Sequence, residues 1–182
     1  PEESWSVARD WGARLLAEDH GAQAAQFLER YEPGEDAHAA DREEWNLLVG
    51  SARLRSGELS AAREHFERVS ETEGGELGVL ALASLALYEQ RESEALALLE
   101  PERVARFSPR GAARAEALLG EAYARSGELG LAREHLQAAL DSALEWEQRS
   151  FGARSAELEA PTARAAGSVI GERLGLHSVA LL

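Results

Sequence analysis

The sequence predicts an all-α fold built from stacked pairs of antiparallel helices, and three observations lead to this prediction. Ala, Leu, Glu, Arg and Gly dominate the 182 residues, Lys, Cys and Met are absent, and Ile occurs once; this composition favours helices over strands. The blocks RSGEL and AREH occur twice, within residues 55–65 and 125–135, at a constant offset of 70. Small residues at positions 12, 50, 83, 120 and 153 are 38, 33, 37 and 33 positions apart, and such a period is typical of stacked helix pairs.

Each predicted pair joins a first helix that carries a small residue to a second helix with an Ala twelve positions later. The small residues are Gly12, Gly50, Ala83, Gly120 and, in a weaker match, Ala153. The alanines are Ala24, Ala62, Ala95, Ala132 and Ala165. A large apolar residue follows each Ala by four positions: Leu28, Phe66, Leu99, Leu136 and Val169. We expect the two helices of a pair to cross at the small residues, with the large side chains filling the space beside them at roughly 1.5–3 kcal/mol each on full burial.

The turn inside a pair carries a glycine in two of the units. Gly57 and Gly127 follow the first helix of the second and fourth pairs, a position that suits the left-handed conformation with which helices often end. Asp19 and Gln90 stand in the same place in the first and third pairs. Between pairs, the chain places helix-breaking residues. These are Pro33-Gly34, Gly74-Gly75, Pro101 and Ser108-Pro109.

This pattern resembles the tetratricopeptide repeat. The fourth unit carries most of the family's motif, in Leu119-Gly120, Tyr123, Gly127, Leu129, Ala132 and Leu136. The second unit matches too, but has Arg53 where the family has an aromatic residue. The resemblance implies a right-handed superhelical solenoid in a single domain, residues 1–182. Its repeats would cover about 5–36, 43–74, 76–109, 113–145 and a degenerate 146–178, in which Pro161 falls between the two helices.

Charge and composition exclude several classes of function. The net charge of −14 and a pI near 4.8 argue against sequence-independent binding of nucleic acid and against an anionic membrane surface. Without Cys, the chain can form neither disulfides nor thiolate metal sites. The composition indicates a bacterial, high-GC source. No signal peptide or membrane-spanning run occurs, and the chain begins at Pro1, so we expect a processed protein or an excised domain. We expect a cytoplasmic location, with a periplasmic or membrane-tethered one as the alternative.

No constellation of residues predicts catalysis, so we expect neither an enzyme, nor a cofactor, nor a metal site. His65 and His135 occupy equivalent repeat positions and are expected to face outward or toward the next unit rather than to bind a metal. The P-loop, GxGxxG, GxSxG and HExxH motifs do not occur. Glu is so abundant that pairs of carboxylates are expected by chance.

In the tetratricopeptide family the first helices line a concave groove, and carrying those positions over gives a candidate partner-binding site. Its residues are Arg9, Leu47, Ser51, Leu54, Leu77, Leu80, Ser84, Leu87, Arg114, Glu121 and Arg154. The Lys and Asn with which some members clamp an acidic C-terminal peptide are missing here. The apolar centre of the groove instead suits an amphipathic helix or an extended apolar segment. The alternative is that these leucines pack against neighbouring helices.

The end of the chain is apolar. Residues 171–182 read GERLGLHSVALL and have two interpretations: a capping segment on the final repeat, or a segment that docks in trans and joins copies into a homo-oligomer. We therefore expect a non-catalytic protein–protein interaction module. A self-associating scaffold and a regulatory domain of a larger protein are the alternatives.

Overall fold

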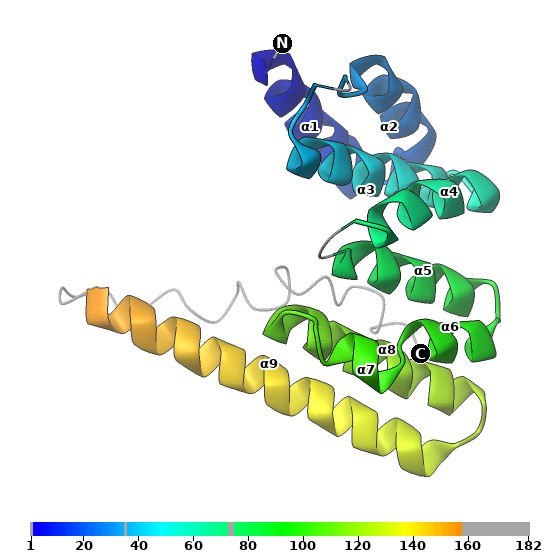
Figure 1. The fold of residues 1–182 in the computed structure, drawn as a ribbon, viewed down its shortest axis with the longest axis vertical. Coiled ribbons are helices and arrows are strands. Elements are labelled where there is room, and N and C mark those ends of the chain that lie inside the picture. Colours follow the sequence, from blue (N-terminus) through cyan, green and yellow to red (C-terminus); the bar gives the residue numbers. More distant parts are fainter. Residues whose placement is uncertain (1, 35, 73–74, 158–182) are drawn as a thin grey trace. The chain divides into compact units, whose positions relative to one another are not determined.

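The structure, a computed structural model, describes residues 2–34, 36–72 and 75–157, and all regular structure in these ranges is helical. The all-α prediction is therefore confirmed for the described residues. The elements in chain order, shown in Figure 1, are α1 (Glu2–Ala17), α2 (Gly21–Leu28), the 3₁₀ turn η1 (Glu29–Tyr31), α3 (Ala39–Arg55), α4 (Leu59–Ser70), α5 (Glu76–Tyr88), α6 (Glu92–Leu98), α7 (Pro101–Val104), α8 (Pro109–Arg125) and α9 (Leu129–Glu157).

The chain divides into two compact units, residues 1–144 and 145–182. The first unit contains α1 to α8 and the first half of α9. Of the second unit, the structure describes the remainder of α9, up to Glu157. In the described residues, no helix combines the length and the apolar character that a membrane span requires.

Four three-residue turns join α1 to α2, α3 to α4, α5 to α6 and α8 to α9. Each turn has its middle residue at positive φ: 62° at Asp19, 82° at Gly57, 59° at Gln90 and 83° at Gly127. The left-handed conformation predicted at Gly57 and Gly127 is confirmed, and the two non-glycine residues adopt it as well. The first helices therefore end in the same way in all four pairs.

The hydrogen bonds of these turns also repeat. The amide of Gly57 donates to the carbonyl of Leu54 at 3.0 Å, and the amide of Glu58 donates to that of Arg53 at 2.9 Å. Bonds with the same spacing close the turns at Asp19, Gln90 and Gly127. This is the Schellman arrangement, which satisfies carbonyls that the end of a helix leaves unpaired.

Changing the residue type at the positive-φ position should change stability in opposite directions at two of these turns. Gly57→Ala should lower the free energy of unfolding by about 1 kcal/mol, because a Cβ disfavours the left-handed conformation while meeting no atom within 4 Å. Gln90→Gly should raise it by about 0.5–1 kcal/mol for the same backbone reason. Urea unfolding of both variants measures the two effects. A loss of stability in Gln90→Gly would show that contacts of the glutamine side chain contribute more to stability than the relief of the left-handed backbone conformation.

The two helices of a pair cross at the predicted small residues. A Cβ added to Gly12 would lie 2.5 Å from Leu28 Cδ2, one added to Gly50 would lie 2.5 Å from Phe66 Cε1, and one added to Gly120 would lie 2.6 Å from Leu136 Cγ. These separations are shorter than non-bonded carbon atoms can approach, so a side chain at any of these glycines would force the facing Leu or Phe side chain to move. In the third pair Ala83 and Leu99 are both buried in one apolar cluster. The predicted packing partners are thus confirmed in the first, second and fourth pairs.

Successive pairs pack through the second helix of one pair and the first helix of the next. Phe66 of α4 lies in an apolar cluster with Leu82 and Leu85 of α5. Leu28 of α2 packs with Trp45 of α3, whose indole nitrogen also donates to the Leu28 carbonyl at 3.0 Å. The largest cluster joins α5 and α6 to α8. The core is therefore a succession of layers through residues 1–144, visible in Figure 1 as helices stacked along the long axis.

The structure differs from the prediction in having no turn at the boundary between the fourth and fifth repeats. Helix α9 continues without a break from Leu129 to Glu157, so residues 146–157 extend this helix and do not begin a new one after a turn. The physical reason is the lack of a strong breaker, because no proline occurs between Pro109 and Pro161. The rest of the predicted fifth unit, including Ala165 and Val169, and the apolar segment 171–182 lie outside the described residues.

Candidate functional site

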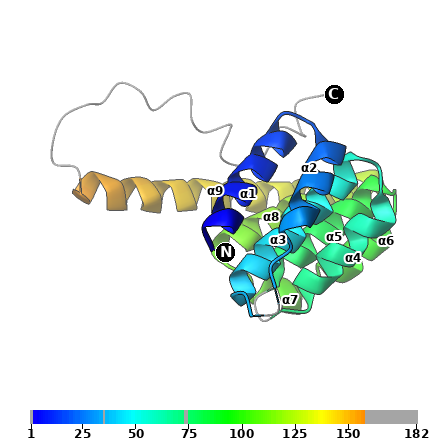
Figure 2. The ribbon, with the colours of Figure 1, turned by 90° about the horizontal axis from the view of Figure 1, so that it is seen from above.

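Apart from Arg154, the residues of the predicted groove belong to the first helices, which contact one another along the stack. Helix α1 approaches α3, where Arg9 forms an ion pair with Glu44 at 3.7 Å. Helix α5 approaches α8, where the Glu76 carboxylate accepts hydrogen bonds from the amide and hydroxyl of Ser108 at 2.6 and 2.7 Å. Viewed along the stack in Figure 2, α1, α3 and α8 lie on the side away from α4 and α6. The first helices α1, α3, α5 and α8 thus contact one another in succession through residues 1–144.

Three of the predicted apolar residues remain accessible on this face. Leu47 and Leu54 are half-buried on α3, with their inner sides against the cluster that contains Phe66. Leu77, in the first turn of α5, is 38% exposed. The spacing of seven residues places Leu47 and Leu54 on the same side of α3. These side chains can contact a partner while they contribute to the core.

Two of the predicted groove leucines are not on the surface. Leu80 and Leu87 are buried in the cluster that also contains Leu99 and Leu119. The reason is the position of α5, which has α4, α6 and α8 packed around it. A helix enclosed on most sides is apolar all round, and α5 reads ELGVLALASLALY. The assignment of Leu80 and Leu87 to a partner-binding floor is therefore wrong, and the apolar part of the face is narrower than predicted.

The predicted polar residues have partners within the chain. The hydroxyls of Ser51 and Ser84 donate to the carbonyls of Leu47 and Leu80, at 2.7 and 2.8 Å. Because these donors are occupied, the two serines would offer a partner their acceptor lone pairs. Glu121 pairs with Arg125 four residues later on α8.

The predicted arginines come before and after the leucines in the sequence. Arg9, near the first end, lies 3.0 Å from Asp10, and the hydrogen bond to Asp10 and the charge of Glu44 raise the pKa of Arg9. Arg114 is exposed near the start of α8. Arg154 belongs to the last part of α9, and its side chain lies outside the described part of the chain.

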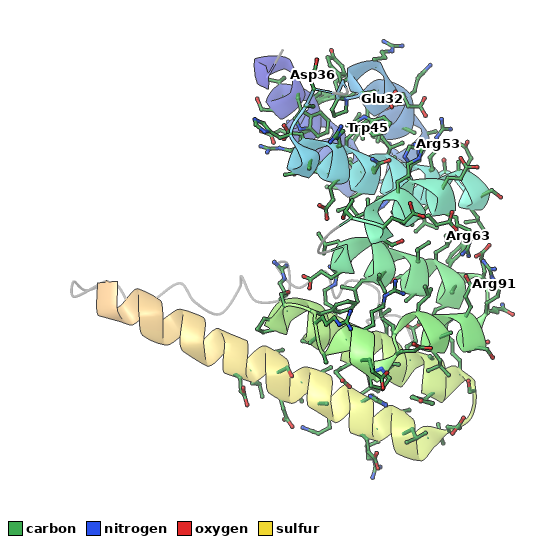
Figure 3. The ribbon with its side chains drawn as sticks, viewed as in Figure 1. Glu32, Asp36, Trp45, Arg53, Arg63 and Arg91 are labelled. Atoms are coloured by element: carbon green, nitrogen blue, oxygen red, sulfur yellow. The ribbon has the colours of Figure 1, made fainter. Side chains whose placement is uncertain are left out.

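An ion-pair network between the second and third pairs was not predicted. Arg63 of α4 binds Glu89 and Glu94 at 2.7 Å each, and Arg91 also pairs with both carboxylates. Figure 3 labels Arg63 and Arg91, which lie on the same side of the stack. The side chains of Arg63 and Glu89 are only 23% exposed, so screening by solvent is limited. The only feature of the sequence that singles out Arg63 is its place in the duplicated AREH block.

The two equivalent histidines face back toward the first helix of their own pair. Nδ1 of His65 lies 2.9 Å from Asn46 Oδ1, and Nδ1 of His135 lies 2.7 Å from Glu116 Oε2. His65 meets Trp45 edge-on, whereas His135 stacks on Tyr123. The predicted outward or next-unit orientation is therefore wrong. Within the described ranges, no group of three His, Asp or Glu side chains is arranged to hold a metal ion.

The environment of His65 predicts a pH-dependent stability. Burial first, and then the charges of Arg68 and Arg53, lower the pKa of His65. The folded state therefore disfavours the protonated ring, and the contribution of His65 is complete above pH about 6.5, the value of a free histidine. It is lost as pH falls below that value, because the unfolded state then binds more protons.

Urea unfolding between pH 7.5 and 5.5 measures this dependence. In His65→Gln the free energy of unfolding should fall less steeply on acidification than in the native chain. The matched substitution at the exposed His38 serves as the control and should leave the slope unchanged. Equal slopes in all three proteins would contradict the role of His65.

No protein-family model matches this chain, and no curated protein matches it.

Proposed function

We propose that this chain is a non-catalytic protein-interaction module, a tetratricopeptide-like solenoid that binds a helix or an extended apolar segment on its first-helix face. The observation that carries the proposal is the presence of half-exposed leucines on two consecutive first helices, Leu47 and Leu54 on α3 and Leu77 on α5. Apolar side chains that are fixed by the core and partly open to solvent are suitable anchors for a partner.

The repeated geometry supports the tetratricopeptide-like part of the proposal. The same turn ends four first helices, and the same glycine crossing occurs in three pairs. A stack built from one repeated unit presents equivalent positions at regular intervals, which is how such proteins form extended binding faces.

The face also restricts the chemistry of the partner. With Leu80 and Leu87 buried, the leucines offer separate anchor points instead of a continuous apolar floor. A partner would need apolar side chains spaced to reach α3 and α5, as in an amphipathic helix. Arg9 and Arg114 lie on the flanking helices α1 and α8, so acidic residues on the partner's outer parts are favoured. The cytoplasmic location and the bacterial source remain predictions.

A matched pair of substitutions tests the binding face. Peptides that bind the native chain would first be selected from a displayed library of amphipathic helices and apolar segments. Leu77→Asp should weaken binding of a selected peptide at least tenfold, because it places a charge on the proposed face. Leu131→Asp alters a leucine of nearly equal exposure, 37%, on α9 and should have no effect. Equal affinities of both variants, with unchanged circular dichroism, would contradict the site.

A second candidate function is a self-associating scaffold. It is favoured by the exposed apolar side chains of α1 and α9, the first and last helices of the stack.

A further inference from the structure

In the first three pairs, the second helices α2, α4 and α6 are each covered by the next first helix through equivalent positions. The large residue four positions after the Ala of the second helix, which is Leu28, Phe66 or Leu99, is buried in the first three pairs. On the covering helix, the residues five and one before the small residue are buried as well. These pairs are Trp45 and Val49 on α3, Gly78 and Leu82 on α5, and Ala115 and Leu119 on α8.

Helix α9 presents the same face without a cover among the described residues. Leu136 is the equivalent of Leu28, Phe66 and Leu99, yet it is 48% exposed. Leu129 and Leu140 are also exposed, and spacings of seven and four residues place all three leucines on one side of the helix. This leucine stripe therefore corresponds to the surface that the next first helix covers elsewhere in the stack.

Helix α1 presents the complementary face, also without a cover among the described residues. The positions five and one before Gly12 are Val7 and Trp11, which are 68% and 48% exposed. Their equivalents on α3, α5 and α8 are buried against the preceding second helix. The first unit thus exposes one half of its repeated interface on α9 and the other half on α1.

Complementary charges indicate how the faces of α9 and α1 would pair. At the interface of α4 with α5 and α6, Arg63 binds Glu89 and Glu94. The residue equivalent to Arg63 on α9 is Arg133, which is exposed and has no ion pair among the described residues. The residue equivalent to Glu89 is Glu18, in the turn after α1, which is half-exposed and pairs with Arg14. Arg133 and Glu18 therefore place the charges of the Arg63–Glu89 ion pair at equivalent positions, whereas Gln23 stands at the position of Glu94.

From this complementarity we propose that α9 of one copy packs against α1 of a second copy, continuing the stacking that joins the pairs within one chain. Leu136 and Leu140 meet Val7 and Trp11, and Arg133 meets Glu18. The contact uses two different faces, so it is a head-to-tail contact and not a symmetric one. It is independent of the leucines on the first-helix face, and either proposal can fail without the other.

Two variants, each with one face blocked, provide the test. Trp11→Glu blocks the α1 face, and Leu140→Glu blocks the leucine stripe of α9. The native full chain should show a mass in analytical ultracentrifugation that rises with concentration above that of one chain, 19.7 kDa. Each variant alone should remain at the mass of one chain. An equimolar mixture should form a one-to-one complex, because each variant retains the face that the other lacks.

A charge exchange tests the pairing independently of apolar contact. Glu18→Arg and Arg133→Glu should each weaken association by roughly two- to fivefold, as expected for a partly exposed ion pair. The chain that carries both substitutions should regain native association, because opposite charges then meet again across the contact with their signs exchanged. Circular dichroism of every variant establishes that it is folded.

Three results would overturn the proposal. Self-association of Trp11→Glu alone would indicate a symmetric contact between two copies of α9. A native chain that stays at the mass of one chain at every concentration would exclude the contact. Association that occurs only after deletion of residues 158–182 would show that the chain's own C-terminal segment covers α9.

Discussion

Gly78→Ala is expected to lower the free energy of unfolding by about 3 kcal/mol, at the upper end of the usual cost of overpacking. Gly78 of α5 lies against the backbone of α4. An added Cβ would be 2.7 Å from the Phe66 carbonyl oxygen, 2.8 Å from the Val69 carbonyl carbon, and closer still to the Ser70 amide nitrogen. Backbone atoms of a helix cannot turn aside as the end of a side chain can, so α4 and α5 would have to separate.

Gly130→Ala is the matched control. Gly130 lies in the first turn of α9, and a Cβ there meets no atom within 4 Å. The same substitution should therefore raise stability by about 0.5–1 kcal/mol, because alanine favours the helix. Chemical unfolding of both variants measures the difference. A Gly78→Ala chain as stable as Gly130→Ala would contradict the close contact between the second and third pairs.

The second large effect is expected at Leu28. Leu28→Ala removes a fully buried side chain that packs against Gly12 and Trp45, and such substitutions cost about 2–5 kcal/mol. Leu136→Ala is the same substitution at the equivalent position of α9. Because about half of the Leu136 surface is already exposed, its cost should be about 1 kcal/mol.

Both leucine variants should be measured by chemical unfolding at a low protein concentration, so that any association of copies does not contribute. Equal losses for Leu28→Ala and Leu136→Ala would show that the face of α9 is covered after all. That result would also remove the basis for stacking between copies.

The crossings and the turns could be predicted because they depend on residue types at fixed spacing. A close crossing requires a small side chain, and a left-handed turn favours glycine, so Gly12, Gly50, Gly57 and Gly127 are visible in the sequence. The positive φ at Gln90 agrees with its repeat position, although its residue type gives no indication of it.

Other features depend on which helices surround a given one, and this information is not local. Leu80 and Leu87 have the same residue type as Leu47, and their burial follows from the enclosure of α5 by three helices. The uninterrupted apolar character of α5 could have indicated this, because it leaves no polar side for solvent. The partners of Arg63 lie 26 and 31 residues away, beyond the reach of helical periodicity. The length of α9 follows from the absence of a proline between Pro109 and Pro161, whereas the weak repeat match at Ala153 does not mark a turn.

The same helix crossing recurs in successive pairs, and nuclear Overhauser spectroscopy of the full chain can test this recurrence. Glycine has no side chain, so cross-relaxation between its Hα protons and side-chain protons reports contacts with the neighbouring helix. We expect contacts from Gly12 to Leu28, from Gly50 to Phe66 and from Gly120 to Leu136, each sixteen residues apart in the sequence. If the Hα resonances of these glycines show only neighbours on their own helix, the repeated crossing is contradicted.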